Sequence, residues 1–263
     1  MADRDSPDGA GLGKASKSCL AHQFAKRGAL EGADVETLED LEKEAVHVRA
    51  GERMREQGRD FTDLIVIRTG WASTFYEVGD GARQVIFVQV SGDIAGIHDM
   101  PYEYAMTSTV ALTECVVCRL PRRRLMDLIE RSPRIASILL MMQMQQQATL
   151  VERLVSLGCR SALKRTAHLL LELDTRRRDA TFDLKEFIPL SQRQVADCLG
   201  LTDVHVNRCM RRLKDAGAIA VGRNRIEVIG REALERFARF DATFLEPSLA
   251  NLGARDEADR VGA

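Results

Sequence analysis

The sequence has 263 residues, of which 45% are hydrophobic and 29% are charged, and its formal net charge at pH 7 is −1. This composition is typical of soluble globular proteins, leaves room for two modest domains, and excludes a uniformly polycationic chain. The longest apolar run is too short to span a bilayer, and the N-terminus MADRDSPDG lacks the features of a signal peptide. We therefore expect a cytoplasmic protein without membrane contacts.

Residues 1–18 are rich in Gly, Ser, Asp and Lys and show no periodicity, which predicts a disordered arm. From residue 19 to residue 44 the apolar positions recur at helical spacing. The positions that can share one helical face are Leu30, Val35, Leu38 and Leu41.

Residues 45–120 differ in kind, because short β-prone runs such as DLIVIRTGW alternate with glycine turns. This alternation is typical of a small antiparallel barrel or jelly roll. The GDG at 79–81 predicts a hairpin turn, and residues 85–90 predict a strand that is buried on both faces. Residues 19–120 are therefore predicted to form one domain built as a double-stranded β-helix, or jelly roll.

Six cysteines are scattered along the chain, and we expect them to be reduced in the cytoplasm. Cys115 and Cys118 form a CxxC, but the surrounding ECVVCRL predicts a strand. Residues three apart on a strand point to opposite faces, which is poor geometry for a shared metal ion. We therefore predict that these two thiols pack in the core.

Residues 121–158 are predicted to form a linker and a dimerisation helix. RRRLMDLIE predicts one helix, and Ser132-Pro133 begins a second that ends near Gly158. A surface helix of this length usually packs against a copy of itself, and the polar QMQQQ segment could set the register. The alternative is a long core helix within one subunit.

Residues 159–245 are predicted to form a DNA-binding domain. Residues 160–225 contain 14 Lys and Arg against 8 Asp and Glu, a net charge of +6 that leaves −7 on the rest of the chain. Helical spacing over residues 160–178 predicts a helix before the basic module. A basic module joined to an acidic one suits a DNA-binding domain attached to a sensor.

The segment SQRQVADCLGLTDVHVNRCMRR, residues 191–212, predicts two short helices joined by a tight turn. Ser191 and Gln194 form a capping box, and Gly200 permits the left-handed backbone of the turn. Thr202 can cap the second helix. The inner face of that helix is apolar and comprises Val206, Cys209, Met210 and Leu213. These features together predict a helix-turn-helix.

KDAGAIAVGRNRIEVIG then predicts a β-hairpin, a wing whose tip carries Arg223 and Arg225. Residues 231–245 are predicted to form one more helix, and residues 246–263 a flexible tail. The predicted fold class is α+β: a jelly-roll sensor domain, a long dimerisation helix and a C-terminal winged helix-turn-helix.

This order of modules resembles the Crp/Fnr family of bacterial transcription regulators over residues 30–240. The resemblance is carried by AGERMREQG, RTGW and SGDIAGI in the roll, and by LGCRSALKRTAHLLLEL and LTDVHVNRCMRRLKDAGAI in the C-terminal module. It implies a homodimer that binds two-fold symmetric double-stranded DNA and recruits or blocks RNA polymerase.

The resemblance also implies that the second helix of the helix-turn-helix lies in the major groove. Arg208 matches a family position that contacts bases, and its planar fork suits guanine. Val204 replaces the common glutamate of the family, so we expect a different half-site. The predicted base contacts are Val204, His205, Asn207 and Arg208. The predicted phosphate contacts are Gln192, Arg193, Thr202, Arg211, Arg223 and Arg225.

Family members hold a cyclic nucleotide through an Arg-Ser or Arg-Thr pair that follows a glycine-acid-x-x-glycine segment. Residues 92–96 match that segment, but no arginine lies between Gly92 and Ala111, so a buried cyclic phosphate would lack its charge partner. The candidate residues of the effector pocket are Gly92, Asp93, Gly96, Thr107 and Ser108. The effector is left open, and a cyclic-nucleotide-responsive regulator is kept as the alternative.

Other cofactors are not expected from the residues present. The oxygen-sensing branch of the family binds an iron–sulfur cluster through clustered N-terminal cysteines, and only Cys19 lies in that region. His98 is a single conceivable haem ligand, and a lone histidine is usually a packed or surface residue. We therefore predict no cofactor and no metal ion.

Two other classes of protein fit the residues less well than a DNA-binding regulator. A small-molecule sensor that works only through protein contacts would not need the turn glycine, the helix caps and the basic outer face. A jelly-roll enzyme such as a cupin would need clustered metal ligands, whereas His47 and His98 are far apart in sequence. We therefore predict a regulator and not an enzyme.

Overall fold

The computed structural model describes residues 18–28, 30–180 and 186–247. Most of the predicted arm and tail, at residues 1–17 and 248–263, thus lies outside the described residues. The chain begins with α1 (Cys19–Ala25), whose first turn is capped by the Ser18 hydroxyl, and α2 (Gly32–Leu41). Leu38 and Leu41 are buried and Leu30 and Val35 pack against the same core, so the predicted apolar face exists.

The roll consists of two antiparallel four-stranded sheets. One sheet has the order β1-β8-β3-β6, with bounds Ala45–Val48, Cys115–Pro121, Asp63–Thr69 and Ile94–Ala95. The other has the order β2-β7-β4-β5, with bounds Arg53–Arg55, Ser108–Ala111, Ala72–Gly79 and Ala82–Gln89. A short 3-10 helix, η1 (Ile97–Asp99), follows β6. The predicted jelly roll is therefore present.

β4 and β5 form the predicted hairpin, whose two turn residues Asp80 and Gly81 both have positive φ. This is the turn chemistry that matches the twist of the strands. The prediction that β5 is buried on both faces is wrong in the middle of the strand, because Ile86 and Phe87 are only half-buried. The pairing register shifts by one residue at Ile86, and such a bulge interrupts the alternation of faces.

β8 separates the two cysteines as predicted. Cys115 packs with Val48 and Met54 in the core between the sheets, whereas Cys118 packs with α1 and α2 on the other face. Both thiols are free and buried, and the Cys118 thiol donates to the backbone oxygen of Glu42 at 3.4 Å. The CxxC is therefore a structural feature of the core.

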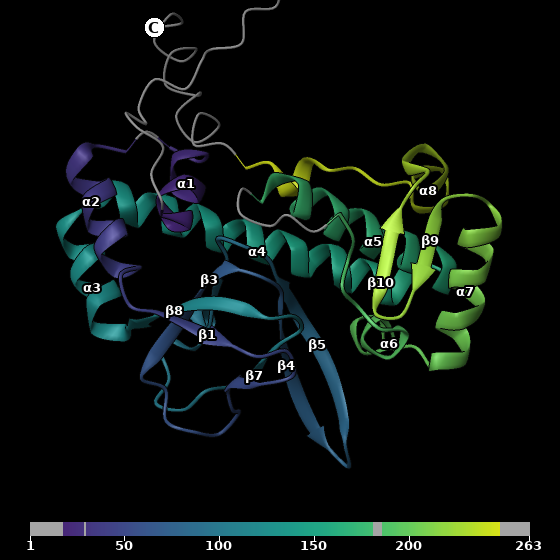
Figure 1. Cartoon of the computed structure of the whole chain (residues 1–263), viewed down its shortest axis with the longest axis horizontal. Helices are drawn as coiled ribbons and strands as arrows, with labels where there is room; N and C mark the ends of the chain where they lie inside the picture. Colours follow the sequence, from purple (N-terminus) through teal and green to yellow (C-terminus); the bar gives the residue numbers. More distant parts are fainter. Residues whose placement is uncertain (1–17, 29, 181–185, 248–263) are drawn as a thin grey trace, which may run out of the picture.

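α3 (Arg122–Arg131) is followed by α4 (Pro133–Cys159), which the hydroxyl of Ser132 caps. In Figure 1, α4 runs along the length of the molecule, with α1 to α3 at one end, the roll along one side and α6 to α8 at the other end. None of the described helices is both long and apolar enough to cross a membrane.

The C-terminal domain comprises α5 (Ala162–Asp179), α6 (Gln192–Leu199), α7 (Asp203–Asp215), the strands β9 (Ile219–Gly222) and β10 (Arg225–Val228), and α8 (Arg231–Ala238). The prediction of one helix over residues 231–245 is wrong. Arg239 adopts a left-handed backbone that ends α8, and a separate 3-10 helix, η2 (Thr243–Leu245), follows.

Candidate nucleic-acid interface

The turn between α6 and α7 is built from local hydrogen bonds. The backbone N–H of Gln194 donates to the hydroxyl of Ser191 at 3.2 Å, and the Gln194 side chain accepts from the backbone N–H of Ser191 at 2.8 Å. Gly200 ends α6 with φ +58°, and Thr202 accepts from the backbone N–H of His205 at 3.4 Å. All three predicted caps are thus confirmed, and they hold the two helices at a defined angle.

α7 has one buried face and one exposed face. Val206, Cys209, Met210 and Leu213 are buried against α5, α6 and the wing, as the sequence predicts. Val204 is 69% exposed, and the other outward positions His205, Asn207, Arg208 and Arg211 are exposed as well. Every predicted base contact therefore lies on the accessible face of one helix, which is the geometry that a major groove admits.

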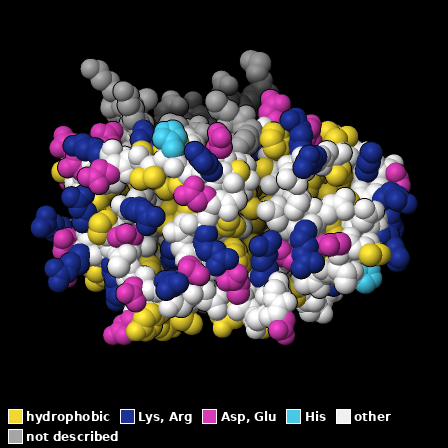
Figure 2. Space-filling model, turned by 60° about the horizontal axis from the view of Figure 1, so that its bottom comes forward, with side chains coloured by type: hydrophobic (Ala, Val, Ile, Leu, Met, Phe, Trp, Pro, Cys, Tyr) yellow, Lys and Arg dark blue, Asp and Glu magenta, His cyan; other side chains and the backbone are white. Residues whose placement is uncertain are grey.

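The arginines of this exposed surface differ in their engagement. Within the described part of the chain, Arg208, Arg211 and Arg223 have no ion-pair partner, so their guanidinium groups are available to an external anion. In Figure 2 the end of the molecule that α7 forms carries many Lys and Arg side chains. An exposed cationic surface of this kind suits a phosphate backbone.

Other predicted contacts are held by neighbouring side chains. Arg193 pairs with Asp197 at 3.1 Å and Asp203 at 3.6 Å. Arg225 pairs with Glu227 at 2.5 Å, and its guanidinium lies 4.3 Å from the ring centroid of Phe187. These two arginines would have to exchange an internal partner for a phosphate.

Two neutral residues are also engaged. The amide of Asn207 donates to the Oε1 of Gln192 at 3.1 Å, which links the outer face of α7 to the start of α6. Thr202 is the N-cap of α7, and its hydroxyl already accepts a hydrogen bond from the backbone N–H of His205. The predicted contacts thus differ in how far neighbouring side chains already engage them.

The roll holds α6 directly, which the sequence did not reveal. Arg83 in β5 donates from Nε to the buried Asp197 at 2.7 Å, and Gln84 donates to the backbone oxygen of Cys198 at 3.1 Å. Asp197 therefore joins Arg83 of the sensor domain to Arg193 of the DNA-binding domain. Residues 114 positions apart cannot be matched from one sequence without a known topology.

The five candidate effector residues fall in two separate places. Gly96, Thr107 and Ser108 lie in the roll, where Thr107 bonds Nε2 of His98 at 3.1 Å and Ser108 accepts from the backbone N–H of Gln57 at 3.0 Å. Gly92 lies instead against the side chain of Gln23 in α1, and Asp93 pairs with Arg176 of α5 at 2.5 Å. The structure therefore does not bring the predicted set into one pocket.

The roll contains a buried arginine that sequence reasoning missed, because it comes from β2 and not from the segment after Gly96. Arg55 forms an ion pair with Asp99, whose side chain is fully buried, and its guanidinium lies 5.0 Å from the ring centroid of Phe61. Burial lowers the pKa of Arg55 to about 10. A side chain at Gly96 would collide with this guanidinium, so Arg55 fills the space directly beside Gly96.

His98 lies beside this ion pair. Burial, together with the positive charge of Arg55, lowers the pKa of His98 to about 4, so the imidazole is neutral at physiological pH. The ring packs against Phe87 with centroids 5.9 Å apart. A neutral, packed histidine that is hydrogen-bonded to Thr107 has a structural role in the roll.

Two family models match the chain. The cyclic nucleotide-binding domain matches residues 45–132, and the Crp-like helix-turn-helix domain matches residues 164–237. The chain is 24% identical over 214 residues to the transcriptional activator protein anr of Pseudomonas aeruginosa, across 81% of this chain and 88% of that protein. It is 29% identical over 211 residues to a probable transcriptional activator of Rhizobium leguminosarum bv. viciae, across 79% of this chain and 85% of that protein.

The fold is similar to that of FixK2 from Bradyrhizobium japonicum, with a TM-score of 0.66 at 22% identity. The match covers 76% of this chain and 98% of that chain. The roll, the long helix and the helix-turn-helix thus occur together, in the same order, in a solved structure.

Proposed function

Because the chain belongs to the Crp/Fnr family of transcriptional regulators, we propose that it acts as a homodimer on a two-fold symmetric DNA site. The observation that carries the proposal is the geometry of α7. Its inner face is buried in the domain core, and its outer face is exposed and carries Arg208 and Arg211, for which the structure describes no ion pair. Two such helices would enter successive major grooves, about one helical turn apart. The protein would act in the cytoplasm, without catalysis, by contacting RNA polymerase at the promoter.

An apolar stripe on α4 supports the dimer. Leu140, Met144, Val151 and Leu154 are all exposed and recur at the spacing of one helix face, and the exposed Gln147 interrupts them. A stripe with this period packs against its own copy in a coiled coil, where a single polar residue sets the register. Its residues project away from the core to which Ile135, Ile138 and Leu139 belong.

Base reading is assigned to the outer face of α7. Arg208 would donate two hydrogen bonds to O6 and N7 of guanine, and Asn207 would pair with adenine after leaving Gln192. The methyl groups of Val204 would contact a thymine methyl, and His205 would donate to a base or a phosphate. Arg211 and Arg223 would neutralise phosphates and position the domain.

The effector is proposed to be other than a cyclic nucleotide. Inside the roll, Arg55 already has Asp99 as its counter-ion, and the guanidinium of Arg55 lies against the candidate pocket residue Gly96. A cyclic phosphate would have to displace a buried carboxylate from its partner, which leaves that carboxylate uncompensated. This pairing favours a regulator whose effector binds elsewhere.

The test begins with selection of bound sequences from random DNA, followed by mobility shifts and sedimentation of the purified full chain. We expect an inverted repeat to be enriched and the protein to sediment as a dimer. Leu154→Glu, at a site 69% exposed, should give a monomer with greatly weakened DNA binding. Val78→Glu, at a site 71% exposed on the roll hairpin, is the matched control and should leave the dimer intact.

Either of two results would contradict the proposal. Selection that enriches no sequence would remove the DNA-reading role. A Leu154→Glu variant that remains dimeric would show that the stripe on α4 is not the interface.

A further inference from the structure

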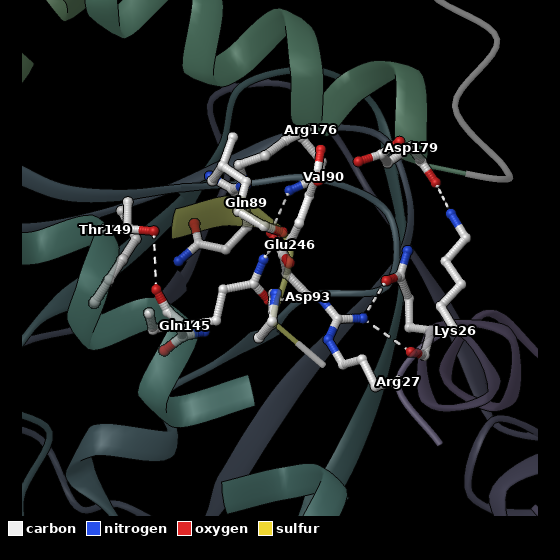
Figure 3. A pocket seen from close by; sticks show the side chains of 15 residues that line it. Lys26, Arg27, Gln89, Val90, Asp93, Gln145, Thr149, Arg176, Asp179 and Glu246 are labelled. Carbon is white, nitrogen blue, oxygen red and sulfur yellow. Dashed lines mark hydrogen bonds and ion pairs between the residues drawn. The ribbon is translucent and has the colours of Figure 1, made fainter. Parts of the chain in front are cut away.

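A cavity of about 360 Å³ lies where the sensor domain, α4 and the DNA-binding domain meet. Its walls come from α1, from the end of β5 and the turn after it, from α4, from the end of α5 and from the residues after η2. Figure 3 shows Arg27, Gln89, Asp93 and Arg176 around this space. The volume is in the range of small-molecule sites, and residues from both domains line it.

Arg27 is a partly buried cation with only neutral partners. Its Nη1 donates to the backbone oxygen and to the Oε1 of Gln23, both at 2.8 Å, and its Nη2 donates to the Oε1 of Gln145 at 2.8 Å. The buried Nε has no hydrogen-bond partner among the described residues, and no described carboxylate lies within ion-pair distance. Burial lowers the pKa of Arg27, and the carboxylates of Asp93 and Asp179, which lie beyond ion-pair distance, only partly offset that cost. A directly bound anion is therefore the partner that this site lacks.

Gln89 is a second group without a full set of partners. Its side chain is only 4% exposed, and its amide Nε2 donates to the hydroxyl of Thr74 at 2.7 Å. Its Oε1 is buried and has no donor in the described part of the chain. A buried acceptor of this kind requires an N–H or O–H, which a bound molecule can supply.

The remaining charges of the cavity are already committed or compensated. Arg176 donates to Asp93 at 2.5 Å and to the backbone oxygen of Val88 at 2.8 Å, and Lys26 donates to the backbone oxygen of Asp179. The carboxylates of Asp93, Asp179 and Glu246 also line the space, so the cavity as a whole is not cationic. Two groups of the cavity therefore still lack a partner: Arg27 lacks an anionic acceptor, and the Oε1 of Gln89 lacks a hydrogen-bond donor among the described residues.

We propose that this junction cavity is the effector site, and that it takes a small hydroxylated anion. The carboxylate or phosphate of the ligand binds Arg27, and a hydroxyl of the ligand donates to the Oε1 of Gln89. Phe87, Val90 and Leu245 supply an apolar wall for the carbon skeleton. The site is distinct from the part of the roll that holds the ion pair of Arg55 and Asp99.

The position of the cavity gives it a regulatory consequence, and this part depends on the proposed DNA-binding function. The cavity adjoins the contact between Arg176 of α5 and Asp93 of the roll, which helps to fix the DNA-binding domain on the sensor. A ligand whose affinity differs between two arrangements of these domains shifts their equilibrium by that difference. Occupancy should therefore change operator affinity by about 5-fold or more.

The first experiment measures binding without DNA, on the full chain, by thermal unfolding and calorimetry. The probes are malate and glycerol 3-phosphate, compared with succinate and with sodium chloride at matched ionic strength. We expect malate or glycerol 3-phosphate to raise Tm by roughly 5 °C at saturation. The probe that raises Tm shows whether the site binds a carboxylate or a phosphate. If neither probe exceeds the chloride effect, the proposal is overturned.

Variants separate a built site from general ionic stabilisation. Arg27→Gln should weaken binding of the responding probe at least about 10-fold, whereas Arg124→Gln, an exposed position on α3, should leave it unchanged. Gln89→Leu should abolish the preference for malate over succinate, because only malate carries the hydroxyl. Equal binding by the wild type and Arg27→Gln would refute the assignment.

The last experiment separates failure of this inference from failure of the proposed DNA-binding function. Operator affinity of the wild type is measured with and without the responding probe. Binding of the probe to a protein that ignores DNA would refute the DNA-binding function and keep the anion site. DNA binding by a protein that binds neither probe would refute the anion site alone.

Discussion

The arginines of α7 differ in burial and pairing from Arg153 and Arg176, which lie at the domain junction, where α4 and α5 contact the roll. On α7, Arg208 and Arg211 are exposed, and the structure describes no ion pair for either of them. At the junction, Arg153 is largely buried, donates to the backbone oxygen of Ile86 at 2.8 Å, and pairs with Glu172 at 3.1 Å. The comparison teaches that pairing and burial, not residue type, decide whether an arginine holds the fold or is available to a ligand.

The junction arginines act on an edge strand. β5 lies at the edge of its sheet, and edge strands expose unpaired backbone groups. Arg153 from α4 and Arg176 from α5 bind the backbone oxygens of Ile86 and Val88, and both also pair with Glu172. Burial acts to raise the pKa of Glu172, but Arg153 and Arg176 outweigh it, and the pKa lies below its ordinary value. The sensor is thereby joined to both helices through charged hydrogen bonds.

The largest effect is expected at the junction. Arg153→Met should lower the free energy of unfolding by about 3 kcal/mol, because it leaves Glu172 buried with only the longer contact to Arg176 at 3.5 Å. Urea denaturation of the full chain measures this change. Arg124→Met on the surface of α3 is the control and should alter stability by less than about 0.5 kcal/mol. Equal stability of the two variants would remove the distinction between the two sets of arginines.

The next effect concerns DNA and not stability. Arg208→Ala should weaken binding to the selected operator by about 1–3 kcal/mol and relax preference at one base position, since it removes a bidentate contact. Titrations against the operator and against random DNA measure the specific part. An equal loss on both DNAs would show that Arg208 contacts phosphate and would place it with the positioning residues.

A smaller effect is expected from the histidine beside Arg55. The pKa of His98 is about 4 in the folded protein, below the ordinary value of 6.5, so the unfolded chain binds its proton more tightly. The stability that the neutral ring contributes is complete above pH 6.5 and is lost as the pH falls towards 4. Since the side chain is 32% exposed, we expect a loss of about 1–2 kcal/mol.

The measurement is urea denaturation between pH 7 and pH 4.5, compared with His98→Gln. The variant cannot take up this proton, so its stability should fall less over the same interval. Parallel curves for the two proteins would argue that neither burial nor the charge of Arg55 lowers the pKa of His98 in the folded protein.

The smallest effect is expected at the tip of the wing. Arg223→Ala should weaken binding to all DNA sequences alike and reduce the salt slope by about one counterion, because it removes one phosphate contact. Binding measured from 50 to 200 mM salt gives the slope. Asn224→Ala is a poor control because Asn224 has φ +49°, so Arg123→Ala on α3 serves instead. An unchanged slope would separate the wing from the DNA-contacting surface.

Local chemistry made much of this molecule predictable. The caps at Ser191 and Thr202 and the left-handed Gly200 depend on residues within a few positions of one another, and the structure confirms all of them. The hairpin at Asp80 and Gly81 follows the same logic. The prediction of one helix over residues 231–245 is wrong because no residue pattern marks Arg239 as a left-handed helix end.

The candidate effector set shows the limit more clearly. Gly92, Asp93 and Gly96 match the glycine-acid-x-x-glycine segment of the family, which predicts one pocket, yet Gly96 lies beside Arg55 in the roll and Asp93 pairs with Arg176 of α5. The absence of an arginine after Gly96 was correct as a statement about sequence. It did not exclude a guanidinium in the roll, because Arg55 arrives from β2 through the folding of the sheet.

The sequence by itself determined the modules: periodicity, caps and turn residues act over a few positions, so the roll, the long helix and the helix-turn-helix could be derived from the order of residues. Only the tertiary structure decided which charges meet. Arg83 reaches Asp197 and Arg55 reaches Asp99 across 114 and 44 positions, and such pairs depend on how the sheets and helices pack. The free energy of a buried charge depends on the partner that packing brings to it, and residues close in sequence do not identify that partner.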